Sequence, residues 1–348
     1  MVAERELSSR RPATAQGATQ GLECFDIGMD LLADGIEPGP VTRVDIETAA
    51  ERIMGRVRRT PVQELGPFAL GGIPGELVLK LELLQYTGSF KPRGAFNRML
   101  AAEVGDEGVI AASGGNFGLA VAFAAHELEH RAEIFVPETS PKIKIDRIRA
   151  LGAEVTVVPG YYADAATACE ERTLQSSALF MHPYDQFEVV AGQGTIGMEL
   201  SEQCPGADTV IVAVGGGGLV AGVAAWYANE ARVVGVEPER SPTMSAALAA
   251  GRPVDVEVGG VAADSLGARR AGDLAHEICD RFLHRMVTVP DEAIVDAQQR
   301  LWHDVHLVAE PGAAAALAAL LCGAYDPEPD ERVVVVVCGA NTDPSTVA

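Results

Sequence analysis

The chain has 348 residues, 48% of them hydrophobic, and a formal net charge of −22. This length suits two ordinary domains with sizeable cores, and no apolar run reaches the ~20 residues of a membrane-spanning helix. The acidic charge argues against nucleic acid or an anionic membrane surface as a partner, because phosphate groups select for basic patches.

The ends and the cysteines point to a cytoplasmic protein. The first residues, MVAERELSSR, are charged and lead into no apolar segment, which argues against secretion. Six cysteines are scattered without a CxxC pair, so we expect reduced thiols rather than a disulfide framework. The seven histidines show no HExxH-type spacing, and a zinc site is not expected from them.

Strands and helices alternate along most of the chain. Residues 1–40 show little periodicity and predict a loose N-terminal arm, after which Thr42 predicts the N-cap of a helix through AAERIMGRV. Apolar, β-branched runs then predict strands, which are 77–84, 108–113, 132–136, 154–158, 178–182, 209–214, 232–237 and 332–337. Helical stretches separate most of them, which predicts an α/β protein with two open, mostly parallel sheets flanked by helices. Such sheets bind ligands beyond the carboxyl ends of their strands.

The first candidate site is the run Thr87-Gly-Ser-Phe-Lys-Pro-Arg-Gly-Ala95. The chain contains four lysines, and Lys91 alone follows a Gly-Ser-Phe turn and opens a predicted helix. The positive end of the helix dipole favours a neutral amine there, as Schiff-base chemistry requires. The alternative is an ordinary solvated lysine.

Two glycine-rich turns follow predicted strands. Ser113-Gly114-Gly115-Asn116-Phe117-Gly118 and Gly215-Gly216-Gly217-Gly218 both lead into helices, where free backbone N–H groups can hold a carboxylate or a phosphate. Gly216, Gly218 and Ala221 also fit the dinucleotide pattern G-x-G-x-x-A, with Glu237 placed to bind a ribose. A dinucleotide site would leave the two earlier motifs unexplained, whereas a single phosphate accounts for this one equally well. Cys338, at the end of the last predicted strand, either faces the crevice or fills the core.

In this order and spacing, the motifs resemble the threonine dehydratase and serine racemase group of fold-type II pyridoxal-phosphate enzymes. The likeness runs from about Val41 to the C-terminus and includes the runs 182–195, 235–239, 259–267 and 309–318. It implies a tryptophan synthase β-like fold with a large cofactor domain (41–108 and 186–348) and a small domain (109–185). It also implies a homodimer with no C-terminal regulatory domain.

The resemblance assigns roles to the candidate residues. Lys91 would carry pyridoxal 5'-phosphate and act as the base at the substrate Cα, flanked by Phe90. The phosphate would lie against Gly215, Gly216, Gly217, Gly218 and Leu219, Asn116 would face the phenolic oxygen, and Cys338 would face the ring nitrogen. Ser113, Gly114, Gly115, Asn116 and Phe117 would grip the substrate carboxylate. A neutral thiol leaves the ring a weak electron sink, which favours loss of the β-hydroxyl.

Several positions depart from the family. Racemases of the group carry a second serine where this chain has Gly114, so racemisation is not expected as the main reaction. Phe117 and Phe187 stand where other residues are usual, as drift or as a reshaped substrate pocket. Metal-binding members follow the glutamate matching Glu237 with an aspartate, but Thr243 stands there, so no required metal is predicted.

The sequence therefore predicts a dehydratase that converts a small β-hydroxy amino acid, such as L-threonine or L-serine, to a 2-oxo acid and ammonia. Two alternatives stay open. One is another activity of the same fold: 3-hydroxyaspartate dehydration, serine racemisation or β-replacement. The other is a binding protein that has kept the cofactor pocket without turnover.

Overall fold

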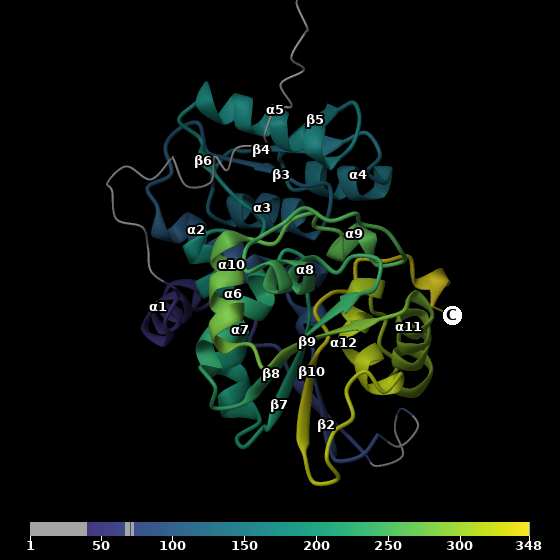
Figure 1. The fold of residues 1–348 in the computed structure, drawn as a ribbon. Coiled ribbons are helices and arrows are strands. Elements are labelled where there is room, and N and C mark those ends of the chain that lie inside the picture. The colour runs from purple at the N-terminus through teal and green to yellow at the C-terminus, as the bar shows by residue number, and fades with distance from the viewer. Residues whose placement is uncertain (1–39, 67–69, 71–72, 348) are drawn as a thin grey trace, which may run out of the picture. The chain divides into compact units, whose positions relative to one another are not determined.

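A computed structural model describes residues 40–66, 70 and 73–347. The predicted N-terminal arm, 1–40, lies almost wholly outside this range. The described chain is an α/β structure with two sheets and helices packed against them, as the sequence predicted (Figure 1). No helix in the described ranges is both long enough and apolar enough to cross a membrane.

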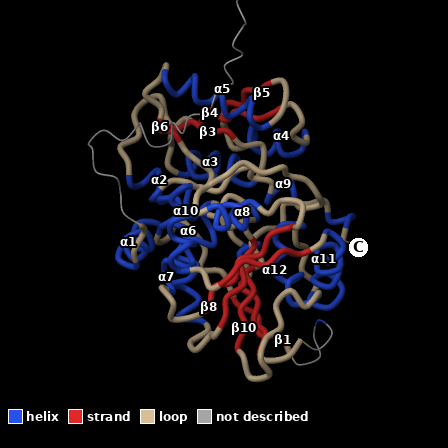
Figure 2. The backbone as a smooth tube through the Cα atoms, viewed as in Figure 1, coloured by secondary structure: helices blue, strands red, loops and turns tan. Residues whose placement is uncertain are grey.

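The larger sheet has six strands in the order β1-β2-β10-β7-β8-β9, and β1 alone runs antiparallel to its neighbour. Figure 2 shows these strands as a twisted fan. Their bounds are β1 Val62–Leu65, β2 Glu76–Lys80, β7 Thr209–Ala213, β8 Arg232–Pro238, β9 Arg285–Val289 and β10 Arg332–Val336. The smaller sheet is all parallel, in the order β5-β4-β3-β6. Its strands are β3 Val109–Ala112, β4 Ala132–Pro137, β5 Glu154–Val158 and β6 Leu179–Phe180.

Twelve α-helices and three short 3₁₀ turns connect the strands in the described ranges. The helices are α1 Arg43–Ile53, α2 Pro92–Ala101, α3 Asn116–Glu127, α4 Lys142–Ala150, α5 Tyr162–Leu174, α6 Phe187–Gln203, α7 Gly218–Tyr227, α8 Thr243–Ala250, α9 Ala263–Leu266, α10 Asp273–Phe282, α11 Asp291–Val305 and α12 Pro311–Leu321. The 3₁₀ turns are η2 Glu82–Leu84, η3 Tyr86–Gly88 and η4 Pro344–Thr346.

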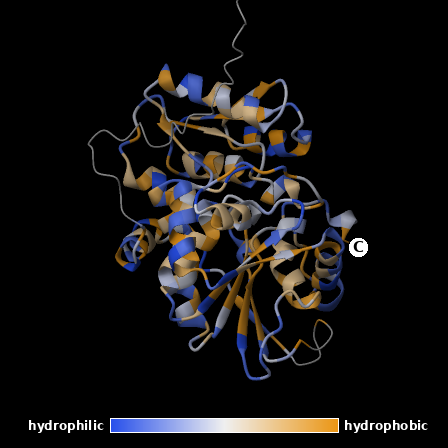
Figure 3. Cartoon of the chain, viewed as in Figure 1, coloured by the Kyte–Doolittle hydropathy of each residue, from blue (hydrophilic) through white to orange (hydrophobic). Residues whose placement is uncertain are grey.

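Burial explains why the sheets form. The inner strands of the larger sheet, β2, β7, β8 and β10, are mostly apolar and buried, with hydrophilic residues gathered at their tips (Figure 3). Because helices cover both faces of these strands, both faces must be apolar, and apolar residues do not alternate with polar ones along the central strands. The large core surrounds β2, β7, β8 and β10, and a second core joins α3 to the smaller sheet. The four strands of the smaller sheet fall within 109–185, while the domain boundaries themselves stay a prediction.

Some sequence predictions need correction. The strand predicted over 77–84 ends at Lys80, because Glu82–Leu84 forms a 3₁₀ turn that buries Glu82 against Arg93. Two edge strands, β1 and β9, were missed because each is short and partly exposed. The predicted N-cap at Thr42 is confirmed, since its hydroxyl accepts the Asp45 N–H and the Asp45 carboxylate accepts the Thr42 N–H. The helix ends at Ile53, earlier than predicted.

Candidate active site

Lys91 lies at the N-cap of α2, half-buried between two aromatic rings. Its Nζ donates a hydrogen bond to the Pro183 carbonyl oxygen at 2.7 Å, and lies 4.9 Å from the Phe90 ring centroid and 5.6 Å from that of Phe117. Burial lowers the pKa of Lys91 to about 8, against the opposing influence of Cys338 and Glu310. An amine with this pKa is neutral in a much larger fraction at physiological pH than an ordinary lysine, and the neutral amine is the nucleophilic form.

The glycine loop 215–218 joins β7 to α7 and forms an anion cradle. Gly217 adopts a φ of +98°, a conformation open to glycine, as the N-cap of α7. The backbone N–H groups of residues 215–219 donate to no acceptor within the described part of the chain. Unpaired N–H groups at the positive end of a helix suit a phosphate. Leu219 contributes only its backbone there, because its side chain is buried in the large core.

Tyr184 connects this loop to Lys91. A Cβ atom at Gly216 would fall 2.5 Å from three Tyr184 ring atoms, and one at Gly218 would fall 2.6 Å from the Tyr184 carbonyl oxygen. Glycine at these positions thus permits close packing of the segment whose Pro183 carbonyl accepts the Lys91 hydrogen bond. The amine and the glycine loop therefore share one wall of the site.

The second glycine-rich turn, 113–118, leads into α3 at the carboxyl end of β3. Ser113 Oγ accepts the Gly115 N–H at 3.3 Å, and the N–H groups of Gly114, Asn116 and Phe117 have no acceptor within the described ranges. This turn is a second set of free donors at a helix N-terminus, suited to a carboxylate. Phe117 is 2% exposed, with its ring facing the Lys91 amine.

Asn116 belongs to a chain of polar contacts that sequence reasoning did not find. Its Nδ2 donates to Glu310 Oε1 at 2.7 Å, and its Oδ1 accepts from Asn341 Nδ2 at 2.7 Å. Asn341 Oδ1 in turn accepts from Arg147 on α4. Glu310 is 4% exposed, and burial raises its pKa to about 7. The sequence signal for Glu310 was faint, a single acid between an apolar run and Pro311.

Cys338 follows β10 and lies beside the start of α2. Its carbonyl oxygen accepts the Phe90 N–H at 3.1 Å. The thiol is buried, and burial raises its pKa, so it remains neutral at physiological pH. The Phe90 bond and the bridge between Ser89 and Gly339 place Cys338 beside the turn that carries Lys91. Phe90, Lys91, Phe117 and Cys338 thus lie near one another, while their roles toward the cofactor stay predictions.

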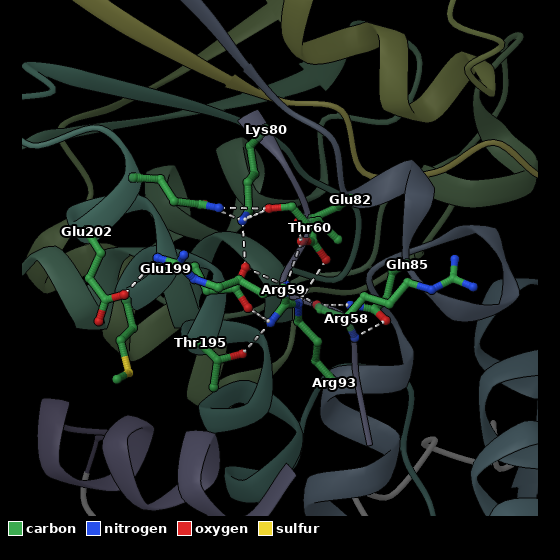
Figure 4. A network of polar contacts seen from close by, with 12 residues as sticks. Arg58, Arg59, Thr60, Lys80, Glu82, Gln85, Arg93, Thr195, Glu199 and Glu202 are labelled. Atoms are coloured by element: carbon green, nitrogen blue, oxygen red, sulfur yellow. Dashed lines mark hydrogen bonds and ion pairs between the residues drawn. The ribbon is translucent and has the colours of Figure 1, made fainter. Parts of the chain in front are cut away.

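A buried ion network supports the Lys91 turn (Figure 4). Arg93, fully buried, donates to both oxygens of Glu82 at 2.9 and 2.8 Å and to both oxygens of Glu199 at 2.7 and 3.0 Å. Lys80 Nζ donates to Glu199 at 2.6 Å and to the Thr60 carbonyl oxygen at 2.9 Å. Two cations and two carboxylates therefore balance, tying β2, η2 and α6 to the residue two positions after Lys91. The sequence alone assigned no role to Arg93.

Glu237 does not stand open for a ribose or a cation. Its carboxylate accepts the backbone N–H groups of Met244 at 2.5 Å and Ser245 at 3.0 Å, and the Ser245 hydroxyl at 2.8 Å, at the start of α8. Burial raises the pKa of Glu237 to about 7, and these donors oppose that rise. A dinucleotide site would need a free acid to bind the ribose, and the Glu237 carboxylate is already occupied by these hydrogen bonds. Among the residues described, no three or more His, Cys, Asp or Glu side chains cluster in a way that could hold a metal ion.

These groups fit pyridoxal phosphate. The free donors of residues 215–219 suit its phosphate, the Lys91 amine suits its aldehyde, and a neutral buried thiol suits an unprotonated ring nitrogen. Asn116, next to Phe117 in the chain, donates a hydrogen bond to Glu310 and adds polar groups to the site. Phe187, by contrast, lies at the first position of α6, where its side chain is partly buried against the large core.

The chain is similar to known proteins over most of its length. Residues 53–339 match the family described as pyridoxal-phosphate dependent enzyme. An L-threonine ammonia-lyase of Thermotoga maritima is 37% identical over 309 residues, covering 87% of this chain and 76% of that protein. A phenylserine dehydratase of Ralstonia pickettii is 36% identical, covering 85% and 92%. A biosynthetic L-threonine dehydratase of Haemophilus influenzae is 36% identical, and this chain spans about half of it, 53%.

Solved structures show the same fold. Maize serine racemase superposes with a TM-score of 0.83 at 30% identity, covering 89% of this chain and 96% of that one. The processed form of threonine deaminase isoform 2 from Solanum lycopersicum superposes with a TM-score of 0.80 at 29% identity, covering 91% and 97%.

Proposed function

The chain belongs to the pyridoxal-phosphate dependent enzyme family, and from that premise we propose that it is a dehydratase of small β-hydroxy amino acids. The reaction converts a substrate such as L-threonine or L-serine to a 2-oxo acid and ammonia. The family and the cofactor predicted from the sequence are confirmed by the match over residues 53–339. The relatives named as threonine ammonia-lyase and threonine dehydratase support the reaction class.

One observation carries the proposal: a half-buried, partly neutral lysine lies near two separate sets of free backbone donors. The bound cofactor supplies an electron sink for the bond broken at the substrate Cα. The N–H groups of residues 215–219 hold its phosphate, and the 113–117 turn binds the substrate carboxylate. Lys91 would hold the cofactor through its aldehyde and, as a free amine, would serve as the general base for the α-proton.

The environment of Cys338 favours elimination. Its buried thiol stays neutral, so beside the cofactor's ring nitrogen it would not act as an acid, and the ring would stabilise negative charge at the substrate Cα only weakly. Loss of the β-hydroxyl relieves that charge. Phe90 and Phe117 shield the amine from water on two sides, which limits competing proton exchange.

The proposal is tested by incubating the purified holoenzyme with β-hydroxy amino acids and measuring 2-oxo acid and ammonia together. Equimolar release from L-threonine or L-serine is expected. Racemisation or β-replacement without 2-oxo acid would favour the other activities of the fold, and bound cofactor without any turnover would favour a binding protein.

Two finer expectations are also proposals. A homodimer is tested by light scattering of the eluted protein, with a mass of twice 36.4 kDa expected. A cytoplasmic location is tested by cell fractionation.

A further inference from the structure

Gly114 lies under the side chain of Ser140. A Cβ atom placed on Gly114 would collide with Ser140 Oγ and would fall 2.9 Å from Ser140 Cβ. The hydroxyl therefore occupies the space that a side chain at position 114 would fill. Ser140 is half-buried, so its hydroxyl lies at the edge of the site rather than in open solvent.

Sheet topology explains this meeting of residues that are far apart in sequence. Gly114 follows β3 and Ser140 follows β4, and the two strands are parallel neighbours in the smaller sheet. Carboxyl ends of adjacent parallel strands meet at one edge, where open sheets bind ligands. The Ser140 N–H donates to the Pro137 carbonyl oxygen at 2.9 Å, a turn that folds residue 140 back over the 113–117 turn.

The Ser140 hydroxyl lies against a turn that carries unpaired donors. The N–H groups of Gly114, Asn116 and Phe117 have no acceptor in the described ranges, and α3 begins at Asn116. A hydroxyl packed against this turn can add one more donor to the free N–H groups of residues 114, 116 and 117.

We propose that Ser140 is a substrate-binding residue that donates its hydroxyl hydrogen to the substrate carboxylate, supplying from the end of β4 the side chain that Gly114 lacks. This inference rests on the proposed function, in which the 113–117 turn binds that carboxylate. It gives Ser140 a part in binding and none in proton transfer at Cα.

The test uses the holoenzyme and separates binding from turnover. L-alanine has no β-hydroxyl to lose, so the spectral change on its addition reports binding alone. Ser140→Ala should raise the Kd for L-alanine and the KM for the reacting amino acid by about tenfold or more, as expected for losing a hydrogen bond to a charged group. The kcat should change by less than about threefold, because the bond is equally strong before and during reaction.

Two comparisons sharpen the result. L-alanine methyl ester carries no carboxylate, so Ser140→Ala should leave its Kd within about twofold of the parent value. Thr139 is the neighbouring residue, exposed and likewise a hydroxyl, so Thr139→Ala should leave both KM and Kd within the same margin.

Moving the serine from position 140 to position 114 tests whether the lost affinity can be restored. Gly114→Ser alone should bind poorly, because its Cβ collides with Ser140. Gly114→Ser combined with Ser140→Gly removes that collision and should return the Kd for L-alanine to within about threefold of the parent.

The inference is overturned if Ser140→Ala binds L-alanine as the parent does, if it loses affinity for acid and ester alike, or if kcat falls while Kd is unchanged. A parent enzyme that binds L-alanine through Ser140 but releases no 2-oxo acid would refute the proposed reaction and leave the inference standing. An active parent enzyme whose Kd and KM do not change with Ser140→Ala would refute the inference and leave the proposed reaction standing.

Discussion

Replacing Glu82 with Gln should destabilise the protein strongly through the ion network beneath Lys91. Glu82 is 0% exposed and shares two hydrogen bonds with Arg93. The substitution keeps the side chain's size but leaves Lys80 and Arg93 facing Glu199 alone, with one unbalanced buried positive charge. Removing one partner of a buried pair costs about 3–5 kcal/mol. The two remaining hydrogen bonds between Arg93 and Glu199 place the expected loss near the lower end, at about 3 kcal/mol.

The assay is equilibrium unfolding of the holoenzyme in urea, followed by circular dichroism. Glu202→Gln is the matched control, because Glu202 lies on the same helix as Glu199 and pairs with Arg59 at 2.8 Å with both side chains more than half exposed. Such a pair contributes about 0–1 kcal/mol. A loss below about 1 kcal/mol for Glu82→Gln, or equal losses for the two variants, would refute the account of the network.

The pH dependence gives a second check on the same variant. Burial alone would raise the pKa of Glu82, but Arg93 and Lys80 lower it below its ordinary value. Its stabilising contribution is therefore complete above the ordinary glutamate pKa of about 4.3 and is lost as pH falls through the lower folded value. The stability difference between the parent and Glu82→Gln should be constant from about pH 5 to 7 and shrink below about pH 4.

Four further outcomes are expected. Lys91→Ala should abolish both turnover and the visible absorbance of bound cofactor, whereas Lys142→Ala, 86% exposed, should keep both; retained absorbance in Lys91→Ala would place the cofactor on another lysine. Uptake of added cofactor by the apoprotein should accelerate as pH rises through about 8, where the Lys91 amine loses its proton, and a flat rate across that range would contradict the lowered pKa. Cys338→Ser should change kcat by less than about fivefold, since the thiol and the hydroxyl are both neutral. A folded, cofactor-loaded Cys338→Asp should lose elimination activity. Unchanged elimination in Cys338→Asp would show that residue 338 does not face the ring nitrogen. Treatment with a chelator should leave activity intact, because the Glu237 carboxylate already accepts three hydrogen bonds, and a loss restored by Mg²⁺ would reverse that conclusion.

The sequence predicted the parts of the molecule that local patterns determine. Uninterrupted apolar runs such as 209–214 and 332–337 could form only buried parallel strands, and the structure places them side by side as β7 and β10. The start of α1 was predictable because a capping box is a local motif. Lys91 could be told apart from the other three lysines because it alone follows a glycine-containing turn and opens a predicted helix.

Contacts between distant segments were not predictable in this way. Glu82 looked like one residue of a strand, and only its encounter with Arg93 explains why the chain turns there. Glu310 gave no signal by itself, because its place in the site depends on Asn116, 194 residues away. The close approach of Ser140 to Gly114 likewise depends on the pairing of β3 with β4. Long-range contacts of this kind cannot be derived from the local patterns of a single sequence.

The most direct test of the central claim is a coupled assay of 2-oxo acid and ammonia from L-threonine, L-serine and 3-phenylserine, with Lys91→Ala as the blank. We predict equimolar 2-oxo acid and ammonia from at least one of these substrates with the parent enzyme, and none with the variant. A cofactor-loaded parent enzyme that releases neither product from any of the three would contradict the assignment as a β-hydroxy amino acid dehydratase.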